Sequence, residues 1–569
     1  MSLSQISEGA PRHSGSMDST IQAASIVQRK DAAAPSDANV DTILTGKKLL
    51  VVFVAMVLSL LVTSLDQTIL ATALPSIASD FNSFTLQGWV ATSFILAQTT
   101  FLLFYGQALK IYSAKWVLIS SIVIFEVGSL LCALAQNIDQ VIAGRTVSGL
   151  GAAGIFVSIF QIIAQVTRLE DRPRYFGALG AVLAVASVVG PLIGGAFTDN
   201  LSWRWCFWIN LPLGGVSLVG VSFLLKASPP LGSDPTKRTW RDIWEQSLGL
   251  DFVGAILVAG AVTSLNLALQ WGGNIKPWND KGVIISFVFA GVLTAVYVIW
   301  EKYLGEKAMT PMAIFQTRSV WGIMAYCFFT RFCMLLFSYY LPIYYQAVRD
   351  RTPTESGIDL LPFQLSLIIT VLICGQIVGK TGYYWPFLPI GTLFLAIGSG
   401  LLYTLGLSTS SANIIGFQIL IGIGTGMGQQ NSLLGIQVQF RDAPNLLSQA
   451  TSMASFALFF GGTVGLGVAE PVFASELTKF LLKYAPDAPA VIAKESPTAI
   501  YTSLAPELIP GVVRSYMESL KIVFVIGVPL AGLALLASLL IENTRLKKTD
   551  PSEPSPEKVD AEQAMSKEV

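Results

Sequence analysis

Charge and histidine are scarce in this chain. Charged residues make up 13% of its 569 residues, and the only histidine is His13. The sequence also lacks the phosphate-binding loop of nucleotide hydrolases and the GxSxG and HExxH motifs of hydrolytic enzymes. An ATP-driven pump or a membrane hydrolase is therefore poorly supported, and we expect neither an enzyme nor a cofactor.

Cysteine is almost as rare, and its spacing argues against two further kinds of site. The five cysteines fall inside apolar segments, without the spacing of metal ligands or of a disulfide framework. The 36 basic and 36 acidic residues cancel, and no basic block carries interleaved aromatic residues, so we expect no nucleic-acid partner. The cysteines are Cys132, Cys206, Cys327, Cys333 and Cys374.

Apolar sequence, in contrast, is abundant. Hydrophobic residues make up 53% of the chain, more than a soluble core requires, and they gather in long blocks. Because about 20 apolar residues span a bilayer as a helix, these blocks predict an all-α polytopic membrane protein with fourteen transmembrane helices. The predicted spans are 49–72, 87–107, 116–136, 140–164, 175–198, 205–226, 250–271, 282–301, 320–346, 358–379, 385–407, 412–434, 447–469 and 521–541.

Two polar segments divide these spans into groups of six, two and six. The first, 227–249, is rich in Pro and charge, and the second is the charged loop 302–319. The predicted parts are a disordered cytoplasmic tail at 1–46, a six-helix bundle at 47–226, the cytoplasmic linker 227–249, two additional helices at 250–301, the cytoplasmic loop 302–319, a second six-helix bundle at 320–541 with a long outer loop at about 470–520, and a cytoplasmic tail at 542–569.

Lys and Arg lie mostly on one side of these spans. The segments that follow spans two, four and six are basic, whereas those at 73–86 and 137–139 contain neither residue. The positive-inside rule therefore places both termini in the cytoplasm. We expect an integral, multi-pass protein of the plasma membrane, with the vacuolar membrane as the alternative.

The fifth span carries an unusual number of residues that disfavour a stiff helix. Its segment 177–195 reads GALGAVLAVASVVGPLIGG, in which Pro191 leaves the carbonyl of Ser187 without its helical donor. Gly190 and Gly194 lie four apart on one face, where another helix can approach closely. The pattern is typical of a bent, tightly packed span, and it also suits a hinge.

A weak internal repeat relates the two groups of six spans. The segment 145–151 in span four aligns with 418–424 in span twelve, the fourth span of the last six, with glycines at the same places. The next span in each group is also glycine-rich, with GPLIGG at 190–195 and GGTVGLG at 461–467. Two matches in the same order indicate duplicated halves around a central path.

Two ionisable residues lie at matching depths in spans one and four. A charge in the hydrocarbon core costs roughly 2.5–3.5 kcal/mol on insertion scales, so each needs a reason. Asp66 lies about 16 residues from the inner end of its span and Arg145 about five from the outer start of its own, so both fall in the outer half of the bilayer. They form either a fixed ion pair or a protonation switch, in which a carboxyl moves between a basic and an apolar environment.

Glu126 and Arg331 are the other two intramembrane charges. Glu126 lies near the middle of span three with no basic residue nearby in the sequence, which suits a second proton carrier or a hydrogen-bonded packing residue. Arg331 in span nine has no obvious partner. It either holds an anionic group of a substrate, or pairs locally or reaches the membrane interface.

Uncharged polar and aromatic side chains gather in several spans. Phe and Tyr crowd the ninth span, and amides recur in both halves. An apolar, aromatic cavity with a few amides would accept bulky, weakly polar ligands, whereas the same residues elsewhere serve as contacts between helices or face lipid. The candidates for a substrate cavity are Gln98, Gln161, Arg331, Tyr339 and Gln430.

Several motifs follow one another in a specific order. They are LDQTILATALPSI at 65–77, GRTVSGLGAAGIF at 144–156, GPLIGG at 190–195 followed by WRWCFWINLPLGG at 203–215, and YYLPIYYQAV at 339–348 leading into SGIDLLP at 356–362. Over about residues 45–545 the chain resembles the major facilitator superfamily. Within it, the chain is most similar to the fourteen-span drug:proton antiporters, in particular the fungal toxin and multidrug efflux pumps.

The resemblance implies a major facilitator fold and roles for several residues. It links the Asp of span one and the Arg of span four to proton coupling, which carries over to Asp66 and Arg145, with Glu126 as a further candidate. The antiporter signature of span five maps onto Gly190, Pro191, Gly194 and Gly195.

One family motif is incomplete here. The loop between spans two and three usually has an Asp four residues after its Gly, followed by a Gly-Arg-Lys run, and these charges form a latch. In GQALKIYSAK at 106–115, Lys110 stands at the place of the Asp, and Ser-Ala replaces Gly-Arg. The usual latch cannot form as written, and only Gly106 and Lys115 remain of it.

The expected function is proton-driven export of a hydrophobic organic compound, such as a secondary metabolite or a xenobiotic, by alternating access. The partners are a small-molecule substrate, protons and the lipid bilayer, and a monomer is expected. The alternatives are a proton-coupled importer of the same fold, such as a siderophore carrier, and a membrane nutrient sensor that moves no substrate. Asn200 begins a formal glycosylation sequon, but it lies too near span six for occupancy.

Overall fold

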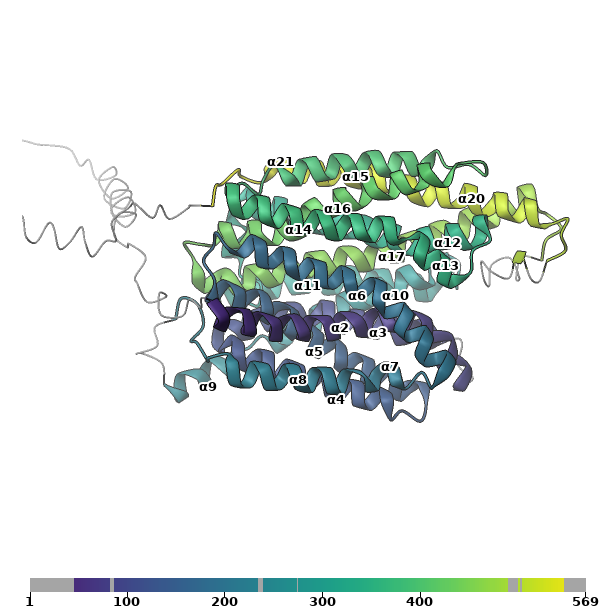
Figure 1. Ribbon diagram of the computed structural model, residues 1–569. Helices are drawn as coiled ribbons and strands as arrows, with labels where there is room; N and C mark the ends of the chain where they lie inside the picture. The colour runs from purple at the N-terminus through teal and green to yellow at the C-terminus, as the bar shows by residue number, and fades with distance from the viewer. Residues whose placement is uncertain are drawn as a thin grey trace, which may run out of the picture. The chain divides into compact units, whose positions relative to one another are not determined.

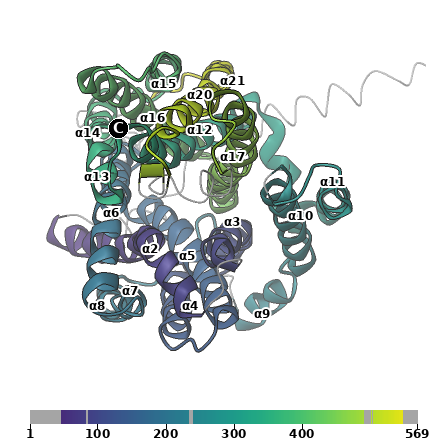
Figure 2. The same ribbon diagram turned by 90° about the vertical axis from the view of Figure 1, so that its right-hand side faces the viewer.

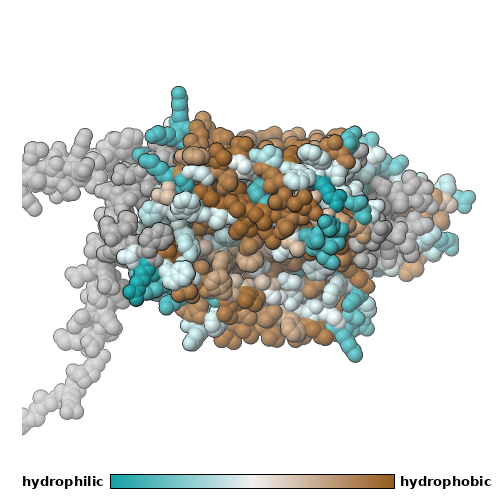
Figure 3. All heavy atoms as spheres, turned by 90° about the horizontal axis from the view of Figure 1, so that it is seen from below, coloured by the Kyte–Doolittle hydropathy of each residue, from teal (hydrophilic) through white to brown (hydrophobic). Residues whose placement is uncertain are grey.

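The computed structural model describes residues 46–81, 86–233, 239–273, 275–489, 500–501 and 504–546. Most helices of this part run along one common direction (Figure 1), and on the face seen in Figure 3 an apolar band lies between two more polar ends. Such a band is what a lipid-facing surface requires, so the chain is an integral, multi-pass membrane protein. Nearly all of the two predicted tails lies outside the described residues.

The helices of the N-terminal half match the first six predicted spans, and the sixth is broken into α7 and α8. They are α2 (Gly46–Asp80), α3 (Gln87–Ile111), α4 (Ala114–Ala133), α5 (Ile138–Val166), α6 (Arg172–Asn200), α7 (Trp205–Trp208) and α8 (Asn210–Leu224). The middle part consists of α9 (Trp240–Leu248), α10 (Phe252–Trp271), α11 (Lys281–Leu304) and the two 3₁₀ turns η4 (Gly305–Lys307) and η5 (Met312–Gln316).

The C-terminal half matches the last six predicted spans. Its elements are α12 (Arg318–Arg349), α13 (Pro353–Asp359), α14 (Leu361–Thr381), α15 (Phe387–Tyr403), α16 (Ser411–Gln439), η6 (Pro444–Leu446), α17 (Leu447–Tyr484), α20 (Ile509–Val525) and α21 (Gly527–Leu540).

Among the described residues, 13 helical segments are long and apolar enough to cross a membrane. The remaining predicted span, 385–407, is occupied by the shorter apolar helix α15. The helices are therefore compatible with fourteen crossings in the order six, two and six, while the number of crossings stays a prediction.

Helices extend into the predicted outer loop at about 470–520. α17 continues to Tyr484, well beyond the predicted end of its span, and α20 begins at Ile509. This extension mixes charged with apolar residues, so a hydropathy window misses it. Its apolar residues Leu477 and Leu481 belong to one buried cluster with Val512 and Tyr516 of α20, and this packing stabilises the helical form.

The same pairs of helices pack in both halves (Figure 2). In the N-terminal half α2 packs against α6, and α5 packs against α3 and α4; in the C-terminal half α12 packs against α17, and α16 packs against α14 and α15. Between the halves, α6 packs against α14 and α3 packs against α17. Span five of each half thus meets span two of the other, which agrees with the predicted duplication.

Glycines that the internal repeat aligns have equivalent neighbours. A Cβ atom on Gly149 would meet the backbone of α3, and one on Gly422 would meet the backbone of α14. Two residues later, Gly151 lies against α4 and Gly424 lies against α15. Each glycine therefore permits the close approach of the corresponding helix in its own half.

The glycine face of α6 packs against α2. A side chain on Gly190 would collide with the Thr68 side chain, and one on Gly194 would collide with the backbone of α2. The Thr68 hydroxyl donates a hydrogen bond to the carbonyl of Ala186, one turn before Gly190 (2.8 Å). The counterpart glycines of α17, at 461–465, lie against α12 in the same way.

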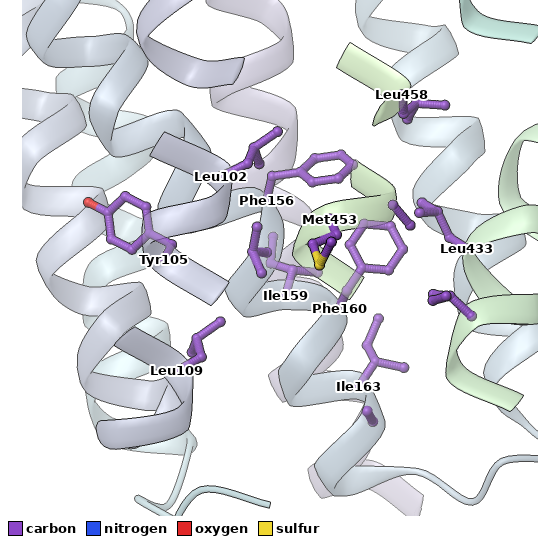
Figure 4. Close-up of a cluster of buried hydrophobic side chains, with 14 of the residues drawn as sticks. Leu102, Tyr105, Leu109, Phe156, Ile159, Phe160, Ile163, Leu433, Met453 and Leu458 are labelled. Carbon is purple, nitrogen blue, oxygen red and sulfur yellow. The ribbon is translucent and has the colours of Figure 1, made fainter. Parts of the chain in front are cut away.

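The two halves touch at the end of the bundle where α3 ends and α17 begins, which we call the linker end because the segment between α8 and α10 lies there. Figure 4 shows Phe160 of α5 beside Met453 and Leu433 of the other half. Arg172 donates to the Gln437 side chain (3.1 Å), and Gln437 donates to the carbonyl of Phe160 (3.4 Å). The halves are therefore held together at this end by apolar packing and hydrogen bonds.

Gly190→Val should destabilise the protein. The added side chain would displace Thr68, and such overpacking costs about 1–3 kcal/mol. Thermal unfolding of the purified protein in detergent measures the effect. Gly195→Ala is the matched control, because a Cβ at Gly195 meets no atom within 4 Å. Equal melting temperatures for the two variants would contradict the close packing of α6 on α2.

Candidate functional site

Asp66 of α2 and Arg145 of α5 form an ion pair inside the N-terminal half. Nη1 of Arg145 donates to Oδ2 of Asp66, and the two side chains are 1% (Arg145) and 0% (Asp66) exposed. The structure thus brings together the two residues whose predicted depths match. Burying both charges is costly, so such a pair is stable only when its other donors and acceptors also find partners.

Two helices, α3 and α7, supply the remaining partners of Arg145. Its Nε donates to the carbonyl of Val90 in α3 (3.3 Å), and its Cζ lies 4.2 Å from the ring centre of Phe94 in the same helix. The ring centre of Phe207 in α7 lies 5.9 Å from Cζ. Cation–π contacts of this kind gain strength when water is excluded. The guanidinium is therefore fixed in position by α2, α3 and α7.

Asn210 belongs to this site, although the sequence analysis missed it. Its side-chain amide donates to Oδ1 of Asp66 (2.8 Å) and to Oγ of Ser129 in α4 (3.1 Å), and the residue is fully buried. Each carboxylate oxygen of Asp66 therefore has a donor. The available signal was the single Asn of WRWCFWINLPLGG, which lies where span six breaks between α7 and α8.

Glu126 lies about one helical turn away from the ion pair. It precedes Ser129 by one turn of α4, and its carboxylate packs against Gly214, one turn after Asn210 in α8. Neither carboxylate oxygen has a hydrogen-bond partner among the described residues. Both oxygens are thus available to accept a proton.

The C-terminal half contains an uncharged counterpart of the ion pair. Gln418 of α16, which aligns with Arg145, donates to the Tyr345 hydroxyl of α12 (2.6 Å) and to the carbonyl of Asp359 (3.1 Å). α12 is the counterpart of α2. Spans one and four are therefore linked in both halves, by charges in the first and by neutral groups in the second.

The other predicted cavity residues, apart from Arg331, differ from one another in burial and in hydrogen bonding. Gln98 is buried and accepts a hydrogen bond from Gln67 of α2 (2.5 Å). Gln161 and Gln430 are also buried, each with a side-chain oxygen that has no partner among the described residues, whereas Tyr339 is 53% exposed. That they line one cavity stays a prediction.

Arg331 has no carboxylate partner among the described residues. Its Nη1 donates to the thioether of Met334 (3.2 Å), which is a weak acceptor, and its Nε has no acceptor. Its Cζ lies 5.6 Å from the ring centre of Phe459, which in turn packs edge-on against Phe156 of the other half (5.1 Å between centroids). An incompletely paired guanidinium thus lies beside the contact between the halves.

Two further predictions concern isolated residues. Asn200, the first residue of the sequon, is the last residue of α6, and its side-chain amide donates to the carbonyl of Ala196 (2.9 Å). The five cysteines are all buried with free thiols.

Comparison with known proteins decides the family. A family model described as Major Facilitator Superfamily matches residues 56–466. This chain belongs to the major facilitator superfamily. It is therefore a membrane transporter and not an enzyme.

Fungal relatives of this transporter carry names that describe transport or efflux. The MFS-type transporter astH of Aspergillus oryzae is 38% identical over 87% of this chain and 86% of its own length. The MFS-type efflux pump MFS1 of Trichophyton rubrum is 35% identical over 93% and 98%, and the efflux pump aunC of Aspergillus niger is 36% identical over 88% and 87%. These likenesses place the transporter in the fungal efflux branch of the superfamily.

A solved structure has the same fold. The human organic anion transporter MFSD10 (TETRAN) aligns with 88% of this transporter and 100% of its own chain, with a TM-score of 0.52 and 13% sequence identity. At this identity the likeness concerns the fold alone.

Arg145→Gln should destabilise the transporter by about 3–5 kcal/mol, because the buried Asp66 carboxylate loses its counter-ion. The double variant Asp66→Asn with Arg145→Gln should recover most of this loss, since the corresponding spans of the C-terminal half are linked by the neutral groups of Gln418 and Tyr345. Thermal unfolding of the three purified proteins measures both effects. If Arg145→Gln is as stable as the wild type, or the double variant is no more stable than Arg145→Gln, the buried ion pair of Asp66 and Arg145 is contradicted.

Proposed function

We propose that this transporter exports hydrophobic organic compounds, such as secondary metabolites or xenobiotics, in exchange for protons. The observation that carries the proposal is the buried Asp66–Arg145 pair with its amide partner Asn210. A buried ion pair in a transporter domain supplies a carboxylate that can bind a proton. It also supplies a cation that loses its counter-ion when the carboxylate does so.

Protonation of Asp66 has a direct mechanical consequence. It would leave Arg145 as a buried cation without a counter-ion, which is unfavourable unless the surrounding helices rearrange. A state in which Arg145 is solvated or re-paired would therefore gain population when Asp66 binds a proton. This differential stability couples proton binding to conformational change.

α6 connects this event to the other half. The second part of α6 packs against α2, where Gly190 meets Thr68, the residue two positions after Asp66. The first part of α6 packs against α14 through Gly177 and Gly180. A shift of α2 against α5 is thus transmitted along one helix to the contact between the halves. The bend allowed by Pro191 suits the predicted hinge.

Glu126 is our candidate for a second proton-binding group. Its carboxylate lacks partners among the described residues and lies about a turn from Asp66 through Ser129 and Asn210. A proton released by one carboxyl would therefore find an acceptor nearby.

The linker end lies in the cytoplasm in this proposal, because the positive-inside rule places both termini there. The halves are joined at this end through Arg172, Gln437 and Phe160. The structure then corresponds to a state closed toward the cytoplasm, and uptake of a compound from inside requires that these contacts break. We place the transporter in the plasma membrane as a monomer.

Arg331 is our candidate for a substrate contact. Its Nε, which has no acceptor among the described residues, belongs to a guanidinium beside the aromatic pair Phe459 and Phe156. An apolar compound that carries an anionic group would find both stacking and charge there. Gln98, Gln161, Tyr339 and Gln430 are the further candidates for the cavity.

Asp66→Asn should abolish proton-driven flux per folded molecule, because an amide cannot bind the proton. The flux is normalised to the folded yield, since this variant also leaves Arg145 without its counter-ion. Compounds found by a panel in pump-deficient yeast would be followed in proteoliposomes under an imposed pH gradient. Asp80→Asn is the control, since Asp80 lies on the same helix with its side chain 50% exposed in a surface pair with Arg204. Glu126→Gln should also lower the flux.

The direction of flux separates the alternatives. Movement of the compound against the proton gradient supports export, movement with protons indicates an importer of the same fold, and the absence of flux for every compound indicates a sensor. Wild-type flux in Asp66→Asn would overturn the role of the ion pair.

Arg331→Gln should lower the transport rate of acidic compounds at low concentration by roughly tenfold or more, because a charge-assisted hydrogen bond is lost. Transport of neutral compounds of similar size should change little. Arg331→Lys keeps the charge and should retain part of the preference. An equal loss for acidic and neutral compounds would show that Arg331 acts through packing and would contradict the contact.

A further inference from the structure

The segment after α11, residues 305–311, is inserted between the two halves at the linker end. Ala308 and Met309 are completely buried although they belong to a short connection between α11 and η5. Connecting segments usually run over a protein surface, because their backbone groups need water or other partners. We call this buried segment the strap, and its backbone groups need partners within the protein.

One glutamine from each half binds the backbone of the strap. Gln107 of α3 donates to the carbonyl of Lys307 (2.8 Å). Gln449 of α17 donates to the carbonyls of Ala308 (3.0 Å) and Met309 (3.3 Å). The strap is thus a bridge of hydrogen bonds between α3 of the N-terminal half and α17 of the C-terminal half.

The strap lies where the family latch is incomplete. Gly106, which remains of the latch motif, permits close approach of α3 to Ser452 of α17. Lys110, at the place of the usual Asp, directs its ammonium to the carbonyl of Glu306 in the strap (3.5 Å). Lys115 donates to the carbonyl of Ser222 within its own half (2.6 Å). Contacts to the strap therefore replace charge pairing between loop and helix.

Two buried carboxyls hold the strap from the side of α10 and α11. Glu301 is 0% exposed and accepts from the backbone N–H of Thr310 (2.7 Å). Asp251 is 3% exposed; its Oδ1 accepts from the indole of Trp300 (2.8 Å), and its backbone N–H donates to Gln107 (3.0 Å). The two carboxyls also interact directly with each other.

Two of the four oxygens of this carboxyl pair lack a hydrogen-bond donor among the described residues. Oε1 of Glu301 and Oδ2 of Asp251 are buried without a donor among the described residues. The groups that face the pair are the Tyr297 hydroxyl and Trp300 from α11, Thr310 from the strap and Gln107 from α3, and none of them is basic. Two adjacent buried carboxyls without a cation are stable when one proton lies between them.

Water has access to the strap from one side. A cleft of about 610 Å³ lies at the linker end, and its lining includes Gln107, Glu306, Lys307, Ala308 and Gln449. The side-chain oxygen of Gln449 is buried there without a partner among the described residues. A proton can therefore reach the region of the carboxyl pair when the strap moves.

We propose that the strap is the cytoplasmic lock of this transporter, and that the Asp251–Glu301 pair is a proton-binding site that keeps the lock closed. Gln107 and Gln449 are its two hydrogen-bonding anchors. Loss of the shared proton would leave two adjacent carboxylates that repel each other and release the strap. The lock rests on the proposed alternating access, whereas its test measures distances and needs neither substrate nor flux.

The test uses spin labels on the two halves. Trp116 of α4 and Thr381 of α14 are exposed at the linker end, and each would be replaced by a cysteine that carries a spin label. The five native cysteines are buried and remain unlabelled. Electron–electron distance measurements on the purified transporter then report the closed and open populations. Gln107→Ala with Gln449→Ala should raise the ratio of long to short distances by roughly tenfold or more, because three neutral hydrogen bonds to the strap are lost.

Gln270→Ala is the matched control for the glutamine variants. Gln270 of α10 donates to Thr92 of α3 (2.9 Å), so it joins the additional helices to the same partner helix as Gln107 does, but far from the strap. This variant should keep the wild-type distances. A long-distance population that is unchanged in the Gln107→Ala, Gln449→Ala variant, or raised equally in the control, would overturn the lock.

Glu301→Gln tests the shared proton. The amide mimics the protonated carboxyl, since its oxygen accepts from Thr310 while its NH₂ donates to Asp251. The long-distance population of the wild type should rise as the pH is raised, because the shared proton is lost, and that of Glu301→Gln should not. The same pH dependence in both proteins would overturn the proton-binding site.

Hydrogen exchange of the wild-type strap needs no substitution and covers the case in which a variant fails to fold. The backbone N–H of Thr310 should be strongly protected near pH 6, since it donates to a buried carboxyl, and protection should fall as pH rises by more than the intrinsic rate explains. Exchange of the strap at the rate of an unfolded peptide would overturn the lock.

Discussion

The cost of burying a charge in a membrane governs the N-terminal half of this transporter. Arg145 lies inside a helix bundle where water is excluded, and this is tolerated because Asp66, the carbonyl of Val90 and the ring of Phe94 surround it. The same partners fix α2, α3 and α5 relative to each other. In the proposed mechanism a proton on Asp66 removes the strongest of these contacts, so that the stability of the half and its response to protons have one origin.

The two halves share a packing pattern but differ in the charge of the link between spans one and four. Glycines at corresponding places allow spans one to five to pack alike in both halves. Spans one and four are linked by an ion pair in the first half and by Gln418 and Tyr345 in the second. A neutral link suffices for packing, which indicates that the charges of the first half serve another purpose.

The sequence predicted the features that depend on hydropathy, spacing and depth. Apolar windows located the spans, and residue counts along two spans brought Asp66 and Arg145 to one level of the bilayer. Hydropathy and spacing do not show which segments far apart in the sequence contact each other. Asn210 joins the site because α7 and α8 break at the right place, and the strap joins both halves through Gln107 and Gln449, which are ordinary amides in the sequence. Helix α17 extends past its predicted end because α20 covers its apolar side.

Proton release on binding of an exported compound tests the central claim most directly. It would be measured with a pH-indicator dye on purified, detergent-solubilised transporter in weakly buffered solution, without a membrane or a gradient. If Asp66 is the coupled carboxyl, the wild type releases about one proton per bound molecule and Asp66→Asn releases markedly fewer while it still binds the compound. Equal proton release from both proteins would contradict the account.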